Sequence, residues 1–158
     1  TPVLRVPMVL GGDDHATAAL RARARARLVL LVRGGASLEQ PIDAADVVEA
    51  IVAALARPGL GGRILDLAGP ESLPRRALVQ RAAALAGAPG PIVLPIPLFA
   101  VRVFAALVER FAADPPLTRP MLDVLEHDDR VDPAPACQAL GLRLTPLDDT
   151  LRRSVASS

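Results

Sequence analysis

The side chains that could do acid–base or metal chemistry lack the partners that such chemistry needs. His15 follows one Asp-Asp pair, and His127 precedes another. A zinc site needs three or four converging ligands, and the chain has no HxxxH or CxxC spacing to supply them. We therefore interpret both histidines as surface residues near helix ends, and we predict neither a metal site nor a catalytic residue in this chain.

Cys137 is the single cysteine, and the sequence assigns it no histidine partner. We interpret it as a small buried apolar residue and not as a nucleophile. A single cysteine also excludes an intramolecular disulfide and is typical of a reducing compartment, which favours a cytoplasmic protein.

Gly11-Gly12 follows a predicted strand and precedes a predicted helix, where a backbone can approach a phosphate or a ribose. The GxGxxG spacing of a dinucleotide-binding loop is absent, so we interpret the pair as a tight turn. The run RARARAR at residues 21–27 would spread its arginines over several helix faces, and we interpret it as solvated surface.

The composition excludes several functions. The chain has 158 residues and a net charge of +1; all 18 basic residues are arginine, and there is no tyrosine or tryptophan. A Schiff-base lysine, a tyrosine general acid and an aromatic platform for RNA are therefore unavailable, and bulk electrostatics favours no nucleic-acid partner. The most apolar stretch, residues 91–108, is broken by two prolines and an arginine, so we predict no transmembrane segment.

Apolar periodicity and turn residues predict alternating strands and helices. With 51% hydrophobic residues a packed core is expected, and the wealth of Arg, Ala, Pro and Gly favours a bacterial, GC-rich genome. Strands are expected at 2–10, 28–32 and 63–68 and an extended segment at 91–97. Helices are expected at 16–27, 46–57, 98–111, 118–125, 133–140 and 146–153, and one that begins at Ser72 or Pro74 and runs to residue 86.

Three details of these elements can be specified further. Asp13 and Asp14 can cap the first helix. Asp43 or Asp46 caps the second helix, whose apolar stripe is Val47, Ile51, Ala54 and Leu55. The tail, residues 154–158, is expected to fray. The fold class is α/β (α+β as an isolated piece), with few strands and a mostly helical C-terminal region.

The order of the segments LRVPMVLGGDD, QPIDAADVVEAIVAAL, GRILDLAGPESLPRRALVQRAAALAG, LPIPLFAVRVFAALVER and LGLRLTPLDDTLRR resembles one family. It is similar to the C-terminal half of atypical and extended short-chain dehydrogenases, the NAD(P)-dependent epimerase/dehydratase superfamily. The branch it most resembles is that of the NADPH-binding accessory subunit of respiratory complex I. The likeness covers residues 1–153.

This resemblance implies a Rossmann-like parent whose glycine loop and Tyr-x-x-x-Lys pair precede Thr1. Val6, Pro7 and Met8 would then line the nicotinamide end of NAD or NADP, a cofactor of the parent that this chain alone is not expected to hold. The family's usual Gly-Pro is Gly11-Gly12 here, and a histidine often stands where Asp43 is.

Substrate contacts are expected from the segments that flank the strand ends, residues 13–39 and 89–98. The candidate substrate-binding residues are Leu38, Gln40 and Arg119. The apolar candidates Leu38, Leu94, Ile96 and Phe99 favour a small lipophilic substrate over a nucleotide sugar. Arg5 and Arg119 could contact an anion, but we interpret both as members of structural ion pairs.

Three hypotheses follow. In the first, residues 1–153 are the substrate-binding portion of an NAD(P)-dependent oxidoreductase or epimerase-like protein, catalytically incomplete without an N-terminal half. In the second, the parent is a non-catalytic nucleotide-binding or assembly protein. In the third, the chain is a free-standing helical module, which fails if segments 2–10, 38–42 and 63–68 pair in a sheet. Because the partners of the first strand are expected outside the chain, we also expect self-association through it.

Overall fold

The computed structural model describes residues 2–12, 14–101, 103 and 130–156. The fold is mixed α/β, as predicted. Within these residues no helix is long and apolar enough to cross a membrane. The elements are β1 (Val3–Arg5), β2 (Val9–Leu10), α1 (His15–Arg25), β3 (Leu28–Val32), β4 (Leu38–Glu39), β5 (Ile42–Asp43), α2 (Ala44–Leu55), β6 (Ile64–Asp66), β7 (Leu73–Pro74), α3 (Arg75–Leu85), β8 (Ile92–Ile96), α6 (Ala134–Leu140) and α7 (Leu147–Ala156), with short 3-10 turns at Arg33–Gly35 and Pro58–Leu60.

The strand expected at 2–10 is two strands, and their partners lie within the chain, which corrects the prediction. β1 pairs with β6 and β2 pairs with β5, both in parallel. Pro7 lies between β1 and β2, where its missing N–H cannot join a ladder. β3 pairs in parallel with β8, and β4 pairs antiparallel with β7. Since segments 2–10, 38–42 and 63–68 all pair, the helical-module hypothesis is wrong.

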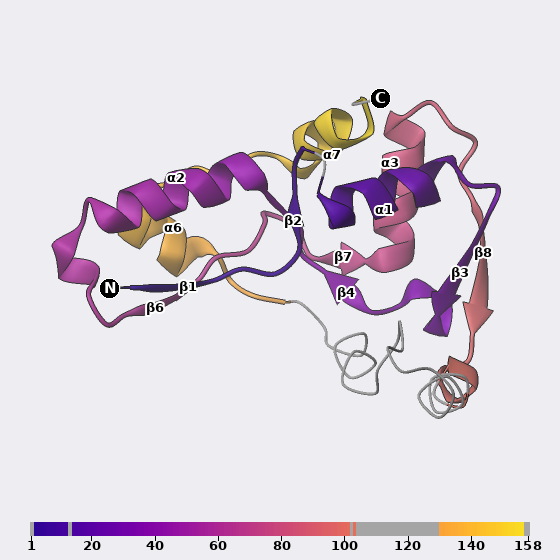
Figure 1. Cartoon of the computed structure of the whole chain (residues 1–158), viewed down its shortest axis with the longest axis horizontal. Coiled ribbons are helices and arrows are strands. Elements are labelled where there is room, and N and C mark those ends of the chain that lie inside the picture. The colour runs from indigo at the N-terminus through magenta and orange to yellow at the C-terminus, as the bar shows by residue number, and fades with distance from the viewer. Residues whose placement is uncertain (1, 13, 102, 104–129, 157–158) are drawn as a thin grey trace, which may run out of the picture.

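The molecule is elongated and has a hydrophobic core at each end (Figure 1). At one end α2 and α6 pack against the β1–β6 ladder, around Leu65 and Leu67. At the other end α1, α3 and α7 pack together, around Leu20, Leu78 and Leu151. The short β2–β5 ladder lies between the two ends and contributes one fully buried side chain, Leu10 or Ile42, to each core.

Helix α1 is fixed at its start by a cap and along its length by arginines. The Asp14 side chain accepts a hydrogen bond from the Thr17 N–H at 2.9 Å, as the capping prediction requires. Arg21 Nε donates to the Ser154 carbonyl at 3.0 Å, and Arg25 Nη2 donates to the Val155 carbonyl at 3.1 Å. The interpretation of this run as wholly solvated is therefore wrong for these two arginines, which hold the C-terminal turn of α7.

Helix α2 begins at an Asp43 cap and buries a different face from the one predicted. Its fully buried residues are Asp46, Ala50 and Ala54, whereas Ile51 and Leu55 are exposed. Asp46 accepts hydrogen bonds from the Thr145 N–H at 2.8 Å and the Thr145 hydroxyl at 2.7 Å. These bonds turn the Asp46 side of the helix inward, so the stripe inferred from periodicity is only partly the packed one.

The C-terminal region is more ordered than predicted. Helix α7 continues to Ala156 and buries both Ser154 and Val155, so residues 154–156 do not fray. Helix α6 ends at Gly141 in a left-handed conformation, close to the predicted end. Of the helix expected at 98–111 only the first turn is described, and the helix expected at 118–125 lies outside the described residues.

Candidate functional site

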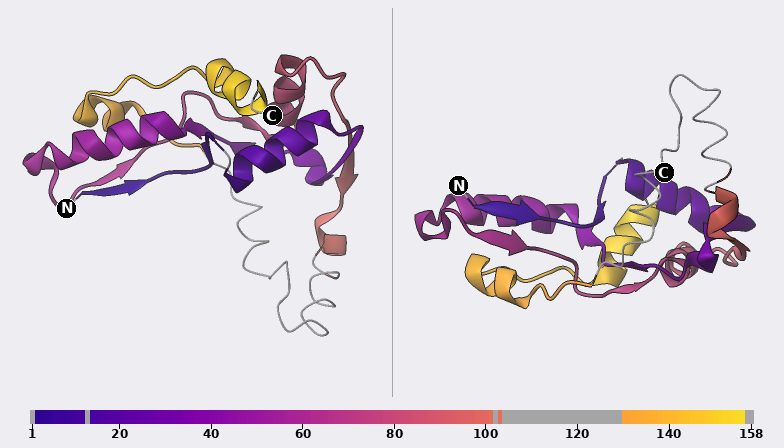
Figure 2. Two further views of the ribbon diagram at one scale, coloured as in Figure 1. Left: turned by 45° about the horizontal axis from the view of Figure 1, so that its top comes forward. Right: turned by 90° about the horizontal axis from the view of Figure 1, so that it is seen from below.

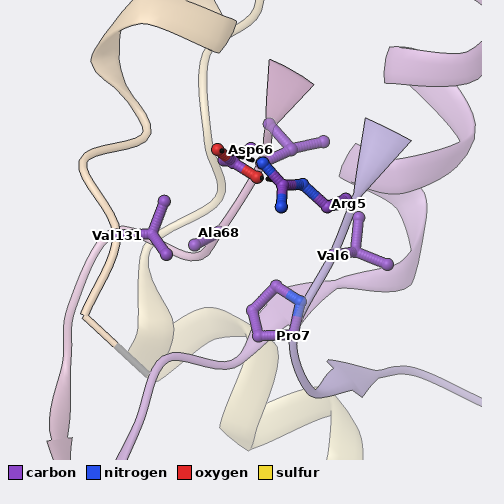
Figure 3. Close-up of a pocket in the computed structure, with 7 residues that line it drawn as sticks. Arg5, Val6, Pro7, Asp66, Ala68 and Val131 are labelled. Atoms are coloured by element: carbon purple, nitrogen blue, oxygen red, sulfur yellow. Dashed lines mark hydrogen bonds and ion pairs between the residues drawn. The ribbon is translucent and has the colours of Figure 1, made fainter. Parts of the chain in front are cut away.

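A pocket of about 250 Å³ opens where the parallel strands β1 and β6 end. Its walls come from three separate segments of the chain (Figure 3). The lining residues are Arg5, Val6, Pro7, Asp66, Leu67, Ala68 and Val131. The carboxyl ends of parallel strands are where open α/β sheets bind their ligands, because loops leave the sheet there and expose backbone groups.

The charged groups of this pocket satisfy each other. Arg5 and Asp66 are register partners on adjacent strands. Arg5 Nε lies 2.8 Å from Asp66 Oδ1, and Arg5 Nη2 donates to Asp66 Oδ2 at 3.2 Å. Both side chains are about half exposed or more. The pair therefore behaves as the structural ion pair we expected for Arg5. The other described residues of the lining contribute apolar side chains or backbone.

Gln40 does not line the pocket, but its side chain holds Val131, which does. Its amide nitrogen donates to the carbonyls of Gly69 and Val131, both at 2.8 Å, and its amide oxygen accepts from the Val131 N–H at 2.8 Å. Gln40 is 3% exposed, so three backbone partners occupy its polar atoms in a buried setting. The predicted substrate ligand thus holds Val131 against the pocket.

The strand end behind Ala68 needs a glycine. A Cβ built on Gly69 would lie 1.7 Å from the Pro41 carbonyl oxygen, which is far inside contact distance. This close approach lets the backbone of the β6 segment reach Gln40, and the Gly69 N–H donates to the Gln40 carbonyl at 3.4 Å. The backbone contact and the Gln40 side chain together fix the positions of Ala68 and Val131, which line the pocket.

The structure brings together two of the three residues predicted at the nicotinamide end. Val6 and Pro7 line the pocket, whereas Met8 packs against the core around α1 and α3. The carbonyl of Met8 accepts the Ile42 N–H at 2.9 Å, which makes it part of the β2–β5 connection. Of the predicted substrate residues, Leu38 lies in β4 opposite Pro74 and away from the pocket lining, and Arg119 lies outside the described residues.

Sequence reasoning missed Asp66, Ala68 and Val131 as pocket residues. A signal for the first two existed, because they end a predicted strand that a doubly wound fold would place beside the first strand. Val131 carries no comparable signal, since it is a coil residue far along the chain that Gln40 holds at the pocket.

A second pocket, of about 400 Å³, lies beside the turn at Gly11 and Gly12. A Cβ on Gly11 would lie 2.6 Å from the Ala44 Cβ, and Gly12 has a left-handed φ of 69°, so the tight-turn prediction is confirmed. Asp43 forms one wall. Its oxygens accept from the Ala45 N–H at 2.9 Å, the Thr150 hydroxyl at 2.9 Å and Arg153 at 2.7 Å. These contacts give Asp43 a structural role in joining α2 to α7.

Among the described residues, the titratable groups near these pockets carry no arrangement typical of acid–base catalysis. Burial, with a smaller effect from the charges of Asp46 and Asp132, raises the pKa of the Cys137 thiol. His15 is exposed at the start of α1, and His127 lies outside the described residues. In the part of the chain that the structure describes, no three His, Cys, Asp or Glu side chains are grouped to hold a metal ion.

Comparison with solved structures gives the wider setting of this fold. The chain superposes on a nucleoside-diphosphate-sugar epimerase from Pseudomonas aeruginosa with a TM-score of 0.68 at 26% identity. It superposes on the human epimerase family protein SDR39U1, solved with NADPH, with a TM-score of 0.73 at 20% identity. A UDP-glucuronic acid 4-epimerase from Bacillus cereus, solved with NAD, gives a TM-score of 0.64 at 14% identity.

These similar structures are epimerases or epimerase-family proteins, two of them solved with NADPH or NAD, and the match covers nearly all of this chain. The matched share of this chain is 98%, 99% and 98%, but the chain spans only 46%, 48% and 42% of the other proteins. No family model matches the sequence, and no curated protein matches it. The chain therefore has the fold of about half of a Rossmann-like epimerase.

Proposed function

We propose that this chain is the substrate-side portion of an NAD(P)-dependent oxidoreductase or epimerase-like protein. The observation that carries the proposal is the pocket at the carboxyl ends of β1 and β6, lined by Val6 and Pro7. In this proposal the nicotinamide end of NAD or NADP, bound mainly by a separate nucleotide-binding half, approaches these two residues. The bound cofactor would supply the hydride chemistry.

The residues of this chain would orient and enclose the reacting groups, and would not transfer protons. Among the residues that the structure describes, Arg5 and Asp66 are the ionisable ones lining this pocket, and they are already paired with each other. Val6, Pro7 and Val131 offer an apolar wall that excludes water from one side of the site. This supports a chain that is catalytically incomplete alone, and it favours a small, lipophilic substrate. The single cysteine favours the reducing cytoplasm as the location of the parent.

The test measures how tightly the parent protein binds its cofactor when a larger side chain at position 6 fills the pocket. Val6 is 38% exposed, so Val6→Trp can enter the pocket without disturbing the core. We expect this variant to weaken NADPH binding at least about tenfold in a fluorescence titration, because one well-packed side chain in the nicotinamide position costs 1–2 kcal/mol. Binding of 2′-phospho-ADP-ribose, which is NADPH without its nicotinamide, should be unchanged.

The matched control is Leu30→Trp, an exposed site on β3 at the other end of the molecule, and it should change neither titration. Equal weakening of NADPH and 2′-phospho-ADP-ribose binding by Val6→Trp would contradict the proposed position of the nicotinamide. Reductase turnover by the 158-residue chain alone would contradict its catalytic incompleteness.

A second candidate is a non-catalytic nucleotide-binding or assembly protein, which the mutually paired charges of the pocket favour. The two candidates predict different sequences and activities for the parent protein. A Tyr-x-x-x-Lys pair together with substrate-dependent NADPH oxidation supports the enzyme. Cofactor binding without that pair, and without turnover, supports the binding or assembly role.

A further inference from the structure

The outer face of the β3–β8 ladder is apolar and exposed. Leu28 pairs in register with Ile92, and Leu30 pairs with Leu94, so these four side chains lie on one face of the two strands. Their exposed fractions lie between 44% and 66%. The residues that alternate with them in β3 are buried, so the other face of that strand is packed. We call the four exposed residues the β3–β8 face.

This face lies at one extreme of the molecule. The three views agree in placing the β3–β8 ladder at the end opposite β1 (Figure 1 and Figure 2). Beyond the end of β8, Phe99 and Val103 add two apolar side chains that are 71% and 57% exposed. An exposed surface of several neighbouring apolar side chains typically marks an interaction with another protein or with a membrane.

The basic residues of the chain are concentrated at the same end. Residues 15–38, which include α1 and β3, and residues 75–103, which include α3 and β8, together contain nine arginines and no acidic residue. The rest of the chain contains the other nine arginines and all 17 acidic residues. The overall net charge of +1 therefore combines one strongly basic part with one acidic part.

Four of these nine arginines are exposed and, among the described residues, form no ion pair: Arg23, Arg27, Arg33 and Arg76. Arg27 directly precedes β3 and Arg33 directly follows it, so an arginine borders the face at each end of this strand. A surface that combines exposed apolar side chains with cations and no anions is complementary to a membrane with anionic lipids.

The same features argue against two other occupants. A second copy of this chain, packed face to face, would bring the arginines at the ends of the two β3 strands together, and like charges in an interface are unfavourable. A protein partner is disfavoured by composition. The core of a protein interface is typically rich in aromatic residues, whereas the exposed apolar side chains here are aliphatic except for Phe99.

We propose that the β3–β8 face, together with Phe99 and Val103, binds the surface of an anionic lipid bilayer. The apolar side chains enter the boundary between headgroups and acyl chains, and the arginines that border the face contact lipid phosphates. The backbone stays outside the hydrocarbon, because a two-stranded ladder has edge N–H and C=O groups that lipid cannot satisfy. This inference does not depend on the proposed function.

The experiment measures co-sedimentation of this chain with vesicles of phosphatidylcholine, alone or with about one-third phosphatidylglycerol. We expect at least about tenfold tighter binding to the anionic vesicles, and a loss of this difference at high salt. Leu30→Glu should weaken binding to the anionic vesicles at least about tenfold, because it removes an apolar contact and adds a negative charge. The double variant Arg27→Gln, Arg33→Gln should weaken it by a similar factor without changing the apolar face.

The matched control is Val52→Glu, at an exposed apolar position of α2 at the other end of the molecule. Val52 is 62% exposed and Leu30 is 58% exposed, so both variants should keep the circular dichroism spectrum and the unfolding temperature of the wild type. Val52→Glu should also keep the wild-type affinity for the anionic vesicles.

Three results would overturn the proposal. Equal binding to neutral and anionic vesicles would exclude the role of the arginines. Equal weakening by Leu30→Glu and Val52→Glu would exclude the β3–β8 face as the binding surface. A folded chain that binds neither kind of vesicle would assign the face to a protein: to a second copy if sedimentation velocity shows a dimer that Leu30→Glu abolishes, and to a different protein if the chain is a monomer.

Discussion

The Gln40 side-chain amide makes two hydrogen bonds of 2.8 Å with the backbone of Val131, 91 residues later in the sequence. It donates to the Val131 carbonyl and accepts from the Val131 N–H. A third bond, to the Gly69 carbonyl, completes the amide of Gln40. This buried clamp fixes the coil that precedes α6 against the end of β6. The pocket lined by Val6 and Pro7 therefore depends on a residue that does not face it.

Replacing Gln40 by leucine should lower the free energy of unfolding by about 3 kcal/mol, because buried peptide groups of Gly69 and Val131 would lose their partners. Urea denaturation followed by circular dichroism measures this difference. Gln80→Leu, the same change at an exposed position of α3, should cost less than about 0.5 kcal/mol. Equal stability of the two variants would show that the clamp contributes nothing.

The arginines of α1 should differ in their contribution to stability. Arg21→Ala and Arg25→Ala should each lower the free energy of unfolding by about 1–2 kcal/mol, because each removes a charged donor from a carbonyl at the C-terminal end of α7. Arg23→Ala on the same helix, where the residue is exposed, should have little effect. Thermal unfolding of the three variants tests this order, and an equal loss in all three would contradict it.

Asp14 should make stability depend on pH in the acid range. Burial acts to raise the pKa of Asp14, but hydrogen bonds from the Thr17 hydroxyl and from backbone N–H groups outweigh it and lower the pKa below 3.8. A lowered folded-state pKa means that the charged form stabilises the fold above about pH 3.8. This contribution is lost as the pH falls through the folded-state value.

The measurement is the unfolding free energy of the wild type and of Asp14→Asn from neutral pH to about pH 2.5. Asparagine keeps an acceptor at the helix cap and removes the charge. The difference between the two proteins should be largest at neutral pH and should shrink as Asp14 becomes protonated. A difference that stays constant over the whole range would contradict a charge effect.

Cys137 should react slowly with thiol reagents at neutral pH. Burial, and then the negative charges of Asp46 and Asp132, raise the pKa of its thiol, which keeps the thiolate fraction low. We expect Ellman's reagent to modify the folded chain at least about tenfold more slowly than the urea-unfolded chain. Equal rates in both states would show that the thiol is neither shielded nor electrostatically disfavoured.

Several predictions from sequence were confirmed because they depend on neighbours within a few residues. Asp14 caps α1 by bonding to Thr17, Asp43 caps α2 by bonding to Ala45, and Gly141 ends α6 in a left-handed conformation. The strand at 28–32 and the extended segment at 91–97 were also found, since β-branched and proline residues restrict the local backbone.

Other features could not be predicted, because the interacting residues are far apart in the sequence. The face that α2 buries depends on Asp46 meeting Thr145, 99 residues later. The C-terminal turn of α7 is held by Arg21 and Arg25, which lie more than 120 residues earlier in the sequence. Periodicity shows that α2 has apolar residues on more than one side, but not which side is packed.

The sequence by itself determined the mixed α/β class, the cap of α2 and the end of α6, because these depend on local caps, turns and backbone restrictions. Only the tertiary structure decided that β1 pairs with β6, so that Arg5 meets Asp66 and a pocket forms where both strands end. It also left the β3–β8 face exposed. Pairing and burial are non-local: their free energy belongs to contacts between distant segments, and no single segment encodes it alone.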